Sequence, residues 1–268
     1  MQNYYKTIGA LAAASTLVVG NAKAEVEYEL HTGYSSEYLF RGVKLGNQLI
    51  EAGADVKGKA AGLDLNAGVW YGSVDGSANL KQEVTGGNAN ETDLYAGAAK
   101  DLGFLTASLG YIYRQYDLGT SWNNEHGMSE DSQELAFGVS RDFGCVTASL
   151  TYYWSIANSG NDKFNTYGNV MPPAVGNNND GYTELALSHS WVLSPCINLN
   201  VGTNLGYLVE KGQATAWTSK VSLDWGFVEH AKLSPFMEVS VPMSDDNDTV
   251  YLGSTNQFVA GAMLSVNF

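Results

Sequence analysis

The strongest constraint on the fold is a series of short segments in which apolar and polar side chains alternate. A strand with this alternation has one apolar face and one polar face. The segment from Gly261 to Phe268 is a clear instance, and the chain stops on its aromatic residue. Because such segments recur along the whole chain at a length of about ten residues, the sequence predicts an all-β protein.

The last segment also fits the terminal strand by which bacterial outer-membrane barrels are recognised for assembly. Its characteristic positions are Gly261, Leu264, Val266 and Phe268. The usual polar residue at the start of this pattern is replaced by Val259. We therefore expect the barrel-assembly machinery to bind this strand, and we expect the protein to reside in the bacterial outer membrane.

The N-terminus has the features of a secretory signal peptide. Lys6 is followed by a small, apolar run from Ile8 to Val19 and by the cleavage motif Ala22-Lys23-Ala24. This run is shorter than the ~20 residues that a spanning helix needs. We expect residues 1–24 to be removed and residues 25–268 to form one outer-membrane β-barrel domain.

Twelve alternating segments follow, joined in turn by short and long connections. They are residues 26–34, 49–57, 63–69, 92–100, 105–116, 134–140, 146–154, 182–191, 197–208, 217–225, 233–241 and 258–268. An even strand number suits a single-chain bacterial barrel. The fold predicted is a transmembrane antiparallel up-and-down β-barrel of 12 strands. Ten or fourteen strands remain compatible, because residues 35–47 and 74–91 each have room for a hairpin.

Composition separates a membrane barrel from a soluble one. A soluble barrel would carry charged residues at high density on its outer face. Here the polar faces are rich in Gly, Ser, Thr and Asn, and the chain holds 16 Tyr, 6 Trp and 30 Gly. Aromatic residues near strand ends are typical of the girdles of membrane barrels.

The chain is strongly acidic. Without residues 1–24 it carries 12 basic and 28 acidic residues, a net charge of −16. This charge argues against nucleic acid as a partner, because such a partner needs a basic surface. Acidic loops that only keep the protein soluble would give the same balance. The partners we expect are outer-membrane lipid and lipopolysaccharide, and the sequence does not define an oligomeric state.

Inward-facing positions carry far more acidic than basic side chains, and this predicts the function. The proposed pore-lining residues are Glu51, Asp55, Asp64, Arg114, Glu134, Glu184, Lys220 and Asp224. An acidic lumen favours cations and repels anions. We therefore predict a passive, porin-like channel for small polar solutes that are cationic or neutral. The alternative is a barrel of this size filled by its own side chains.

Arg41, in the first long connection, is a candidate constriction residue. Its side chain would either fold into the lumen or stay at the barrel rim and pair with Glu37. The sequence leaves both arrangements open.

Two further features concern the ends of the barrel. Cys145 and Cys196 are the only cysteines, and each follows a short turn, so an oxidising compartment would allow a disulfide between them. The acidic runs Ser244–Asp248 and Ser129–Asp131 would, in the alternative of a structural or adhesive barrel, contact divalent ions, lipopolysaccharide or a partner. Their spacing matches no calcium loop, so solvated charge explains them equally well.

A hydrolase is the third alternative, because catalysis by a histidine base needs a carboxylate and a hydroxyl or water nearby. His31 and His189 are the candidates for such a base. The parity of His189 places it on the lipid face beside Trp191, where an interfacial histidine is the simpler interpretation. The sequence contains no zinc cluster, phosphate loop or dinucleotide fingerprint. We expect no enzymatic activity, no cofactor and no resident metal.

The motif Tyr38-Leu-Phe-Arg41-Gly42, followed by a strand and then Ala67-Gly68-Val69-Trp70, resembles an uncharacterised Gram-negative outer-membrane family. Members of that family open with a similar Tyr-x-Phe-Arg-Gly motif. The resemblance covers about the first fifty residues after the signal peptide, and beyond them it is one of architecture. It implies an outer-membrane barrel, and it carries over no substrate or catalytic residue.

Overall fold

The computed structural model describes residues 26–75, 89–117, 129–158, 181–209, 212–243 and 255–268. The predicted signal peptide and the acidic run at 244–248 lie outside these residues. Every regular element in the described part of the chain is a β-strand. The strands are β1 (Glu27–Ser35), β2 (Tyr38–Phe40), β3 (Val43–Gly46), β4 (Gln48–Ala60), β5 (Leu63–Asp75), β6 (Ala89–Asp101), β7 (Thr106–Asp117), β8 (Ser129–Asp142), β9 (Thr147–Asn158), β10 (Tyr182–Ser194), β11 (Ile197–Leu208), β12 (Gln213–Val228), β13 (Ala231–Pro242) and β14 (Gln257–Asn267). Within the described ranges, no helix has the length and apolar character needed to cross a membrane.

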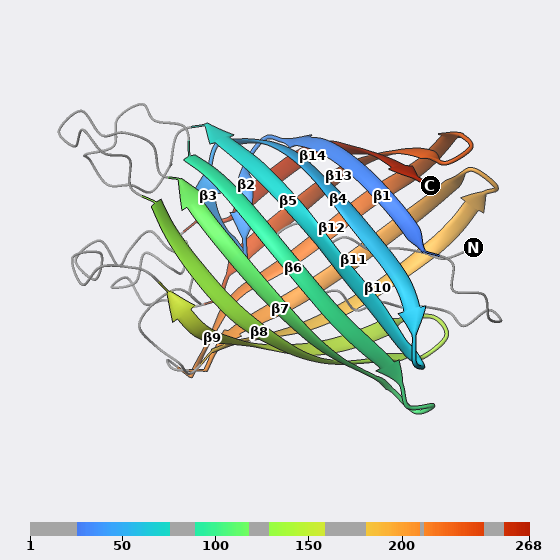
Figure 1. Cartoon of the computed structure of the whole chain (residues 1–268). Coiled ribbons are helices and arrows are strands. Elements are labelled where there is room, and N and C mark those ends of the chain that lie inside the picture. Colours follow the sequence, from blue (N-terminus) through green and yellow to red (C-terminus); the bar gives the residue numbers. More distant parts are fainter. Residues whose placement is uncertain (1–25, 76–88, 118–128, 159–180, 210–211, 244–254) are drawn as a thin grey trace.

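Twelve of the strands form a closed antiparallel barrel (Figure 1). Each strand pairs with its neighbours in the chain, and β1 closes the barrel by pairing with both β4 and β14. At the closure Phe268 and Tyr28 exchange two backbone hydrogen bonds, of 2.9 and 3.3 Å. The prediction of a 12-stranded up-and-down barrel is therefore confirmed.

The barrel has two distinct ends. At one end, here called the short-turn end, tight turns join β4 to β5, β6 to β7, β8 to β9, β10 to β11 and β12 to β13. The first and last barrel strands also begin and finish there (Figure 1). The other end, where β5, β7 and β9 finish and β6, β8 and β10 begin, is here called the long-loop end. The run Ser129–Asp131, expected in a loop, instead forms the first residues of β8.

Strands β2 and β3 form a separate two-stranded sheet that does not join the barrel wall. We call this segment, Tyr38–Gly46, the inner hairpin. It occupies the connection between β1 and β4 and folds into the barrel at the long-loop end (Figure 1). The room for a hairpin noted at residues 35–47 is thus used, but it adds no strand to the barrel.

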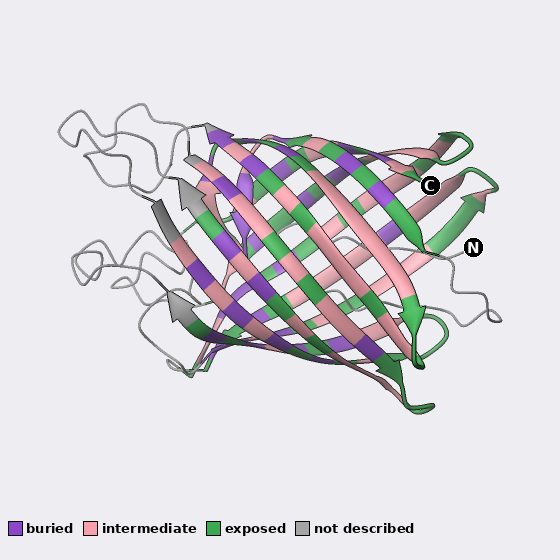
Figure 2. Cartoon of the chain, viewed as in Figure 1, coloured by how far each residue is buried: buried purple, intermediate pink, exposed green. Residues whose placement is uncertain are grey.

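Alternation along each strand separates the outer face from the interior. On β1 the side chains of Glu29, His31 and Ser35 are buried, whereas Tyr28 and Leu30 are about half exposed. The same alternation continues around the barrel, so that large apolar side chains cover the outside. Buried positions concentrate toward the long-loop end (Figure 2), where the inner hairpin fills the lumen.

The possible disulfide is not formed in this structure: Cys145 and Cys196 are exposed free thiols. The reason is the register between β9 and β10. Thr147, at the start of β9, pairs with Ser188, whereas β10 continues six residues further to Ser194 before its turn. At about 3.3 Å per residue, this stagger separates the two turns by roughly 20 Å along the strands. A disulfide needs Cα atoms closer than about 7 Å.

Candidate functional site in the barrel interior

All eight predicted lining residues lie on interior positions of the barrel. Four are nearly inaccessible: Glu51, Arg114, Glu134 and Glu184 expose at most 2% of their surface. The other four have side chains that are 10–15% exposed: Asp55, Asp64, Lys220 and Asp224. Their interior position follows from the structure, while their role in solute passage stays a prediction.

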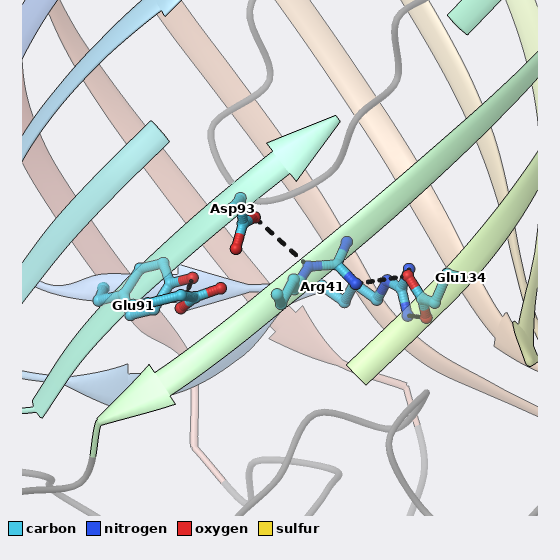
Figure 3. A network of polar contacts seen from close by, with 6 residues as sticks. Arg41, Glu91, Asp93 and Glu134 are labelled. Carbon is cyan, nitrogen blue, oxygen red and sulfur yellow. Dashed lines mark hydrogen bonds and ion pairs between the residues drawn. The ribbon is translucent and has the colours of Figure 1, made fainter. Parts of the chain in front are cut away.

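Arg41 is the tip residue of the inner hairpin, and its side chain crosses the lumen to reach the wall. Its guanidinium donates two hydrogen bonds to the two carboxylate oxygens of Glu134 on β8, at 3.0 and 2.8 Å (Figure 3). Both side chains are completely buried. Hydrogen bonds between charged groups are shorter and stronger than neutral ones, and a forked guanidinium–carboxylate pair also fixes orientation.

The same carboxylate holds a second arginine. Arg114 on β7 donates to Glu134 Oε2 at 2.6 Å, and its Nε lies 3.4 Å from Asp93 Oδ2 on β6. We call these four residues, Arg41, Asp93, Arg114 and Glu134, the arginine–carboxylate cluster. It links the hairpin tip to three consecutive barrel strands.

Three aromatic rings enclose the Arg41 guanidinium. Its Cζ lies 4.4 Å from the ring centre of Tyr153, 4.5 Å from that of Tyr182 and 4.9 Å from that of Phe40. The tyrosines belong to β9 and β10, and both are buried. Contact between a cation and an aromatic face is favourable, and more so where water is excluded. In the barrel wall, Glu134 therefore binds the edge of the Arg41 guanidinium, and Tyr153 and Tyr182 contact its faces.

The local sequence explains how Arg41 reaches this position. Arg41 and Gly42 both have positive φ, 50° and 81°, so the chain reverses sharply between β2 and β3. Gly42 lies against the side chain of Ala216 on β12, and Ser240 on β13 donates to its carbonyl oxygen at 2.9 Å. A side chain at position 42 would collide with Ala216, so glycine is required.

The alternative of Arg41 pairing with Glu37 at the rim is wrong, because another residue takes that partner. Lys44 on β3 forms an ion pair with Glu37 at 2.5 Å, within the connection itself. Lys44 and Glu37 are each about one fifth exposed. Arg41 is therefore free to enter the lumen.

Other side chains of the inner hairpin contact different parts of the barrel wall. The Tyr38 hydroxyl donates to Glu91 Oε2 on β6 at 2.6 Å, and Leu39 packs against Phe236 and Val259 on β13 and β14. A further group of contacts involves Tyr38, Phe40, Leu49, Val74, Leu45 and Trp70. The inner hairpin thus contacts the barrel wall on several sides.

These hairpin contacts were not predicted, although the sequence carries a signal for them. Inward positions at the long-loop end hold apolar side chains where an open aqueous lumen would hold polar ones. Leu49 and Val259 are examples, at 0% and 3% exposure. The replacement of a polar residue by Val259 in the C-terminal pattern is explained in the same way, because this side chain packs against Leu39.

Glu184 differs from the other buried carboxylates. It lies beside Tyr182 and Asn204, and Arg41 is the charged group that acts most strongly on it. Neither of its oxygens has a hydrogen-bond partner of standard geometry among the described residues, and the side chains that act on it as hydrogen-bond donors are Asn204 and Tyr182. Glu184 is thus a buried carboxylate with incomplete hydrogen bonding next to the Arg41 guanidinium.

Polar contacts continue toward the short-turn end. Lys232 pairs with Asp224 at 3.2 Å, and Lys59 pairs with Asp64 at 3.1 Å. The Nζ of Lys220 lies 4.0 Å from Glu238 Oε2 and 4.0 Å from the ring centre of Phe236. Carboxylates here and at the long-loop end outnumber the basic groups that face them.

The two histidines considered for a hydrolase have different surroundings. The Nδ1 of His31 lies 3.3 Å from Asp55 Oδ2, and the hydroxyl of Tyr95 donates to the other oxygen of that carboxylate at 2.5 Å. His189 lies on the outer face with its ring edge-on to Trp191, at 4.2 Å between ring centres. The outward orientation expected for His189 is thus observed, while its place at the membrane interface stays a prediction. Among the described residues, no group of three His, Cys, Asp or Glu side chains is placed to hold a metal ion.

A closed antiparallel sheet with an apolar outer face and a charged interior defines a β-barrel protein of the bacterial outer membrane. The chain belongs to a bacterial protein family of unknown function, Gcw_chp, whose model matches residues 20–229. The match includes Tyr38 to Gly42, although the proposed motif itself stays a prediction. No curated protein matches this sequence.

Solved outer-membrane channels and porins have similar folds. The COG4313 outer membrane channel from Pseudomonas putida F1 is 12% identical, with a TM-score of 0.54 over 93% of this chain and 97% of that one. The P. putida toluene transporter TodX is 10% identical, with a TM-score of 0.49 over 92% and 91%. The KdgM porin is 9% identical, with a TM-score of 0.46 over 90% and 99%. At these identities the first likeness supports the barrel fold and nothing finer.

Proposed function

We propose that the protein is a passive outer-membrane channel for small polar solutes, cationic or neutral, and that the inner hairpin closes it in the state described here. The observation that carries the proposal is the interior itself. Between its apolar clusters it is lined by ionisable and hydroxyl-bearing side chains rather than by a continuous apolar core. A barrel that served only as a membrane anchor would have no need of such costly buried charges.

The sign of the interior charge gives the proposed selectivity. The interior carboxylates among the described residues are Glu29, Glu51, Asp55, Asp64, Glu91, Asp93, Glu134, Glu184, Asp224 and Glu238. The interior bases are fewer: Arg41, Lys57, Lys59, Arg114, Lys220 and Lys232. Rings of carboxylates favour cations, so cations should pass more readily than anions once the hairpin moves.

Selectivity is tested by recording currents from the refolded protein in a planar bilayer with asymmetric potassium chloride. We expect discrete current steps whose reversal potential indicates a preference for potassium over chloride. Asp55→Asn removes an interior charge without touching the inner hairpin, so it should reduce the preference while steps continue. Steps with a preference for chloride would contradict the proposed selectivity.

A second candidate function is favoured by the inner hairpin. A barrel that is permanently filled would serve a structural or adhesive role, with its acidic loops in contact with divalent ions, lipopolysaccharide or another macromolecule. The tight packing of Leu39, Phe40 and Arg41, each at most 5% exposed, supports this reading. A correctly folded protein that stays silent in the bilayer, both intact and with its hairpin contacts weakened, would favour it over the channel.

The proposed assembly route uses the C-terminal strand. Leu264 and Phe268 of the predicted signal point outward, with 38% and 69% of their surface exposed. We propose that the barrel-assembly machinery binds this apolar edge before β14 pairs with β1. None of the residues proposed for solute passage takes part in this contact.

A further inference from the structure

The wall around Arg41 has every feature of a binding site for a guanidinium group. Glu134 accepts both arms of the fork, and the rings of Tyr153 and Tyr182 lie within 4.5 Å of its central carbon. These groups come from three consecutive strands, β8, β9 and β10. Glu134, Tyr153 and Tyr182 therefore belong to the barrel wall, and the inner hairpin supplies the occupant together with the third ring, Phe40.

The wall also offers more acceptor capacity than Arg41 uses. Glu184 is 2% exposed and has no hydrogen-bond partner of standard geometry among the described residues, although Asn204 and Tyr182 act on it as hydrogen-bond donors. Glu184 follows Tyr182 by two positions on β10, so the two side chains face the same side of the strand. A second carboxylate thus lies next to the occupied site and adds to its attraction for cations.

We propose that this wall site binds small solutes that carry a guanidinium group, and that such a solute competes with Arg41 and releases the inner hairpin. The inference rests on the proposed channel function and names its solute class. The forked geometry favours a guanidinium over an ammonium, because an ammonium is a point charge that does not match both carboxylate oxygens at once.

Competition has a quantitative consequence. Arg41 is tethered, so its effective concentration at the site is on the order of millimolar or higher. A free solute must approach that concentration before it displaces the hairpin in the intact protein. Removal of the Arg41 side chain leaves Glu134 held by Arg114 alone, and the free solute should then bind at much lower concentration.

The test measures binding of ethylguanidinium to the refolded protein by calorimetry, with ethylammonium as the matched probe. We expect Arg41→Ala to bind ethylguanidinium at least tenfold more tightly than the intact protein does. It should also bind ethylguanidinium at least tenfold more tightly than ethylammonium. Adding Glu134→Gln should weaken binding about tenfold or more, since hydrogen bonds to a charged partner are lost. Adding Glu229→Gln, a carboxylate whose side chain is 90% exposed in the turn between β12 and β13, should leave binding unchanged.

Equal binding by Arg41→Ala with and without Glu134→Gln would overturn the inference, as would equal affinity for the two probes. If Arg41→Ala fails to fold, as judged by heat-modifiable gel migration, Arg41→Lys serves instead. Its ammonium competes less well, so ethylguanidinium should bind it more tightly than the intact protein, and unchanged affinity would overturn the inference.

Conductance separates the two proposals. Binding of ethylguanidinium to a protein that never conducts would refute the channel and uphold the site. Conductance in a protein that shows no preference for ethylguanidinium would uphold the channel and refute the site.

Discussion

Glu134→Gln should destabilise the docked hairpin more than any other single substitution in the barrel wall. The Glu134 carboxylate accepts hydrogen bonds of 3.0 and 2.8 Å from Arg41 and of 2.6 Å from Arg114. Glutamine has nearly the same shape, but it is neutral and keeps one acceptor oxygen. The substitution therefore leaves two buried arginines without their shared counter-charge.

The magnitude follows from these contacts. Removal of one partner from a buried ion pair costs about 3–5 kcal/mol. The amide oxygen of glutamine recovers part of this cost, so we expect the docked hairpin to lose ~3 kcal/mol of stability. Because 1.4 kcal/mol corresponds to a factor of ten, the equilibrium between docked and undocked hairpin should shift about 100-fold toward the undocked state.

Single-channel recording measures this shift as the fraction of time spent open. We expect the open fraction of Glu134→Gln to rise by tenfold to about 100-fold, until it saturates. Asp224→Asn is the control, because it also removes an interior carboxylate but one that pairs with Lys232, away from the hairpin. An open fraction that is equal in the two variants would refute the reasoning.

Three further predictions concern the hairpin and the turns. Gly42→Ala should raise the open fraction, because the added methyl group collides with Ala216. The positive φ of 81° at this position also costs an L-residue about 1–2 kcal/mol. An unchanged open fraction would show that the hairpin tip does not dock as described. Leu39→Ala should also raise the open fraction, since truncation of a buried leucine costs about 2–5 kcal/mol. Met237 faces outward at 55% exposure, so Met237→Ala should leave the open fraction unchanged. Cys145 and Cys196 should both react with a maleimide reagent without prior reduction, and mass spectrometry counts the labels. A protein that accepts no label until it is reduced would contradict the separation of the two turns.

Much of the barrel could be predicted from local alternation. The segment predicted at residues 197–208 coincides with β11, and the segment at 92–100 lies within β6, Ala89–Asp101. Most strands are longer than predicted, because alternation fades where the strands leave the apolar layer while backbone pairing continues. The interior parity of Glu51, Asp55 and Glu184 followed directly from the two-residue period.

The inner hairpin could not be predicted in the same way. Arg41 and Glu134 are 93 positions apart, and they meet only once twelve strands have closed. Residues 38–46 form two strands too short to show alternation, and residues 38–41 are buried one after another. The useful signal was indirect, since Leu49 and Val259 place apolar side chains where an open lumen would be polar. Likewise, the separation of Cys145 from Cys196 depends on the register between β9 and β10, and no local pattern specifies that register.

The central claim, that an acidic lumen is closed by the inner hairpin, is tested most directly by removing the hairpin. Ser35 pairs with Leu49 across β1 and β4, so a tight turn of about four residues can replace residues 36–48 without altering the barrel register. The refolded variant, with its fold confirmed by heat-modifiable migration, should conduct continuously and prefer potassium over chloride. A folded, hairpin-free barrel that carries no current would contradict the account.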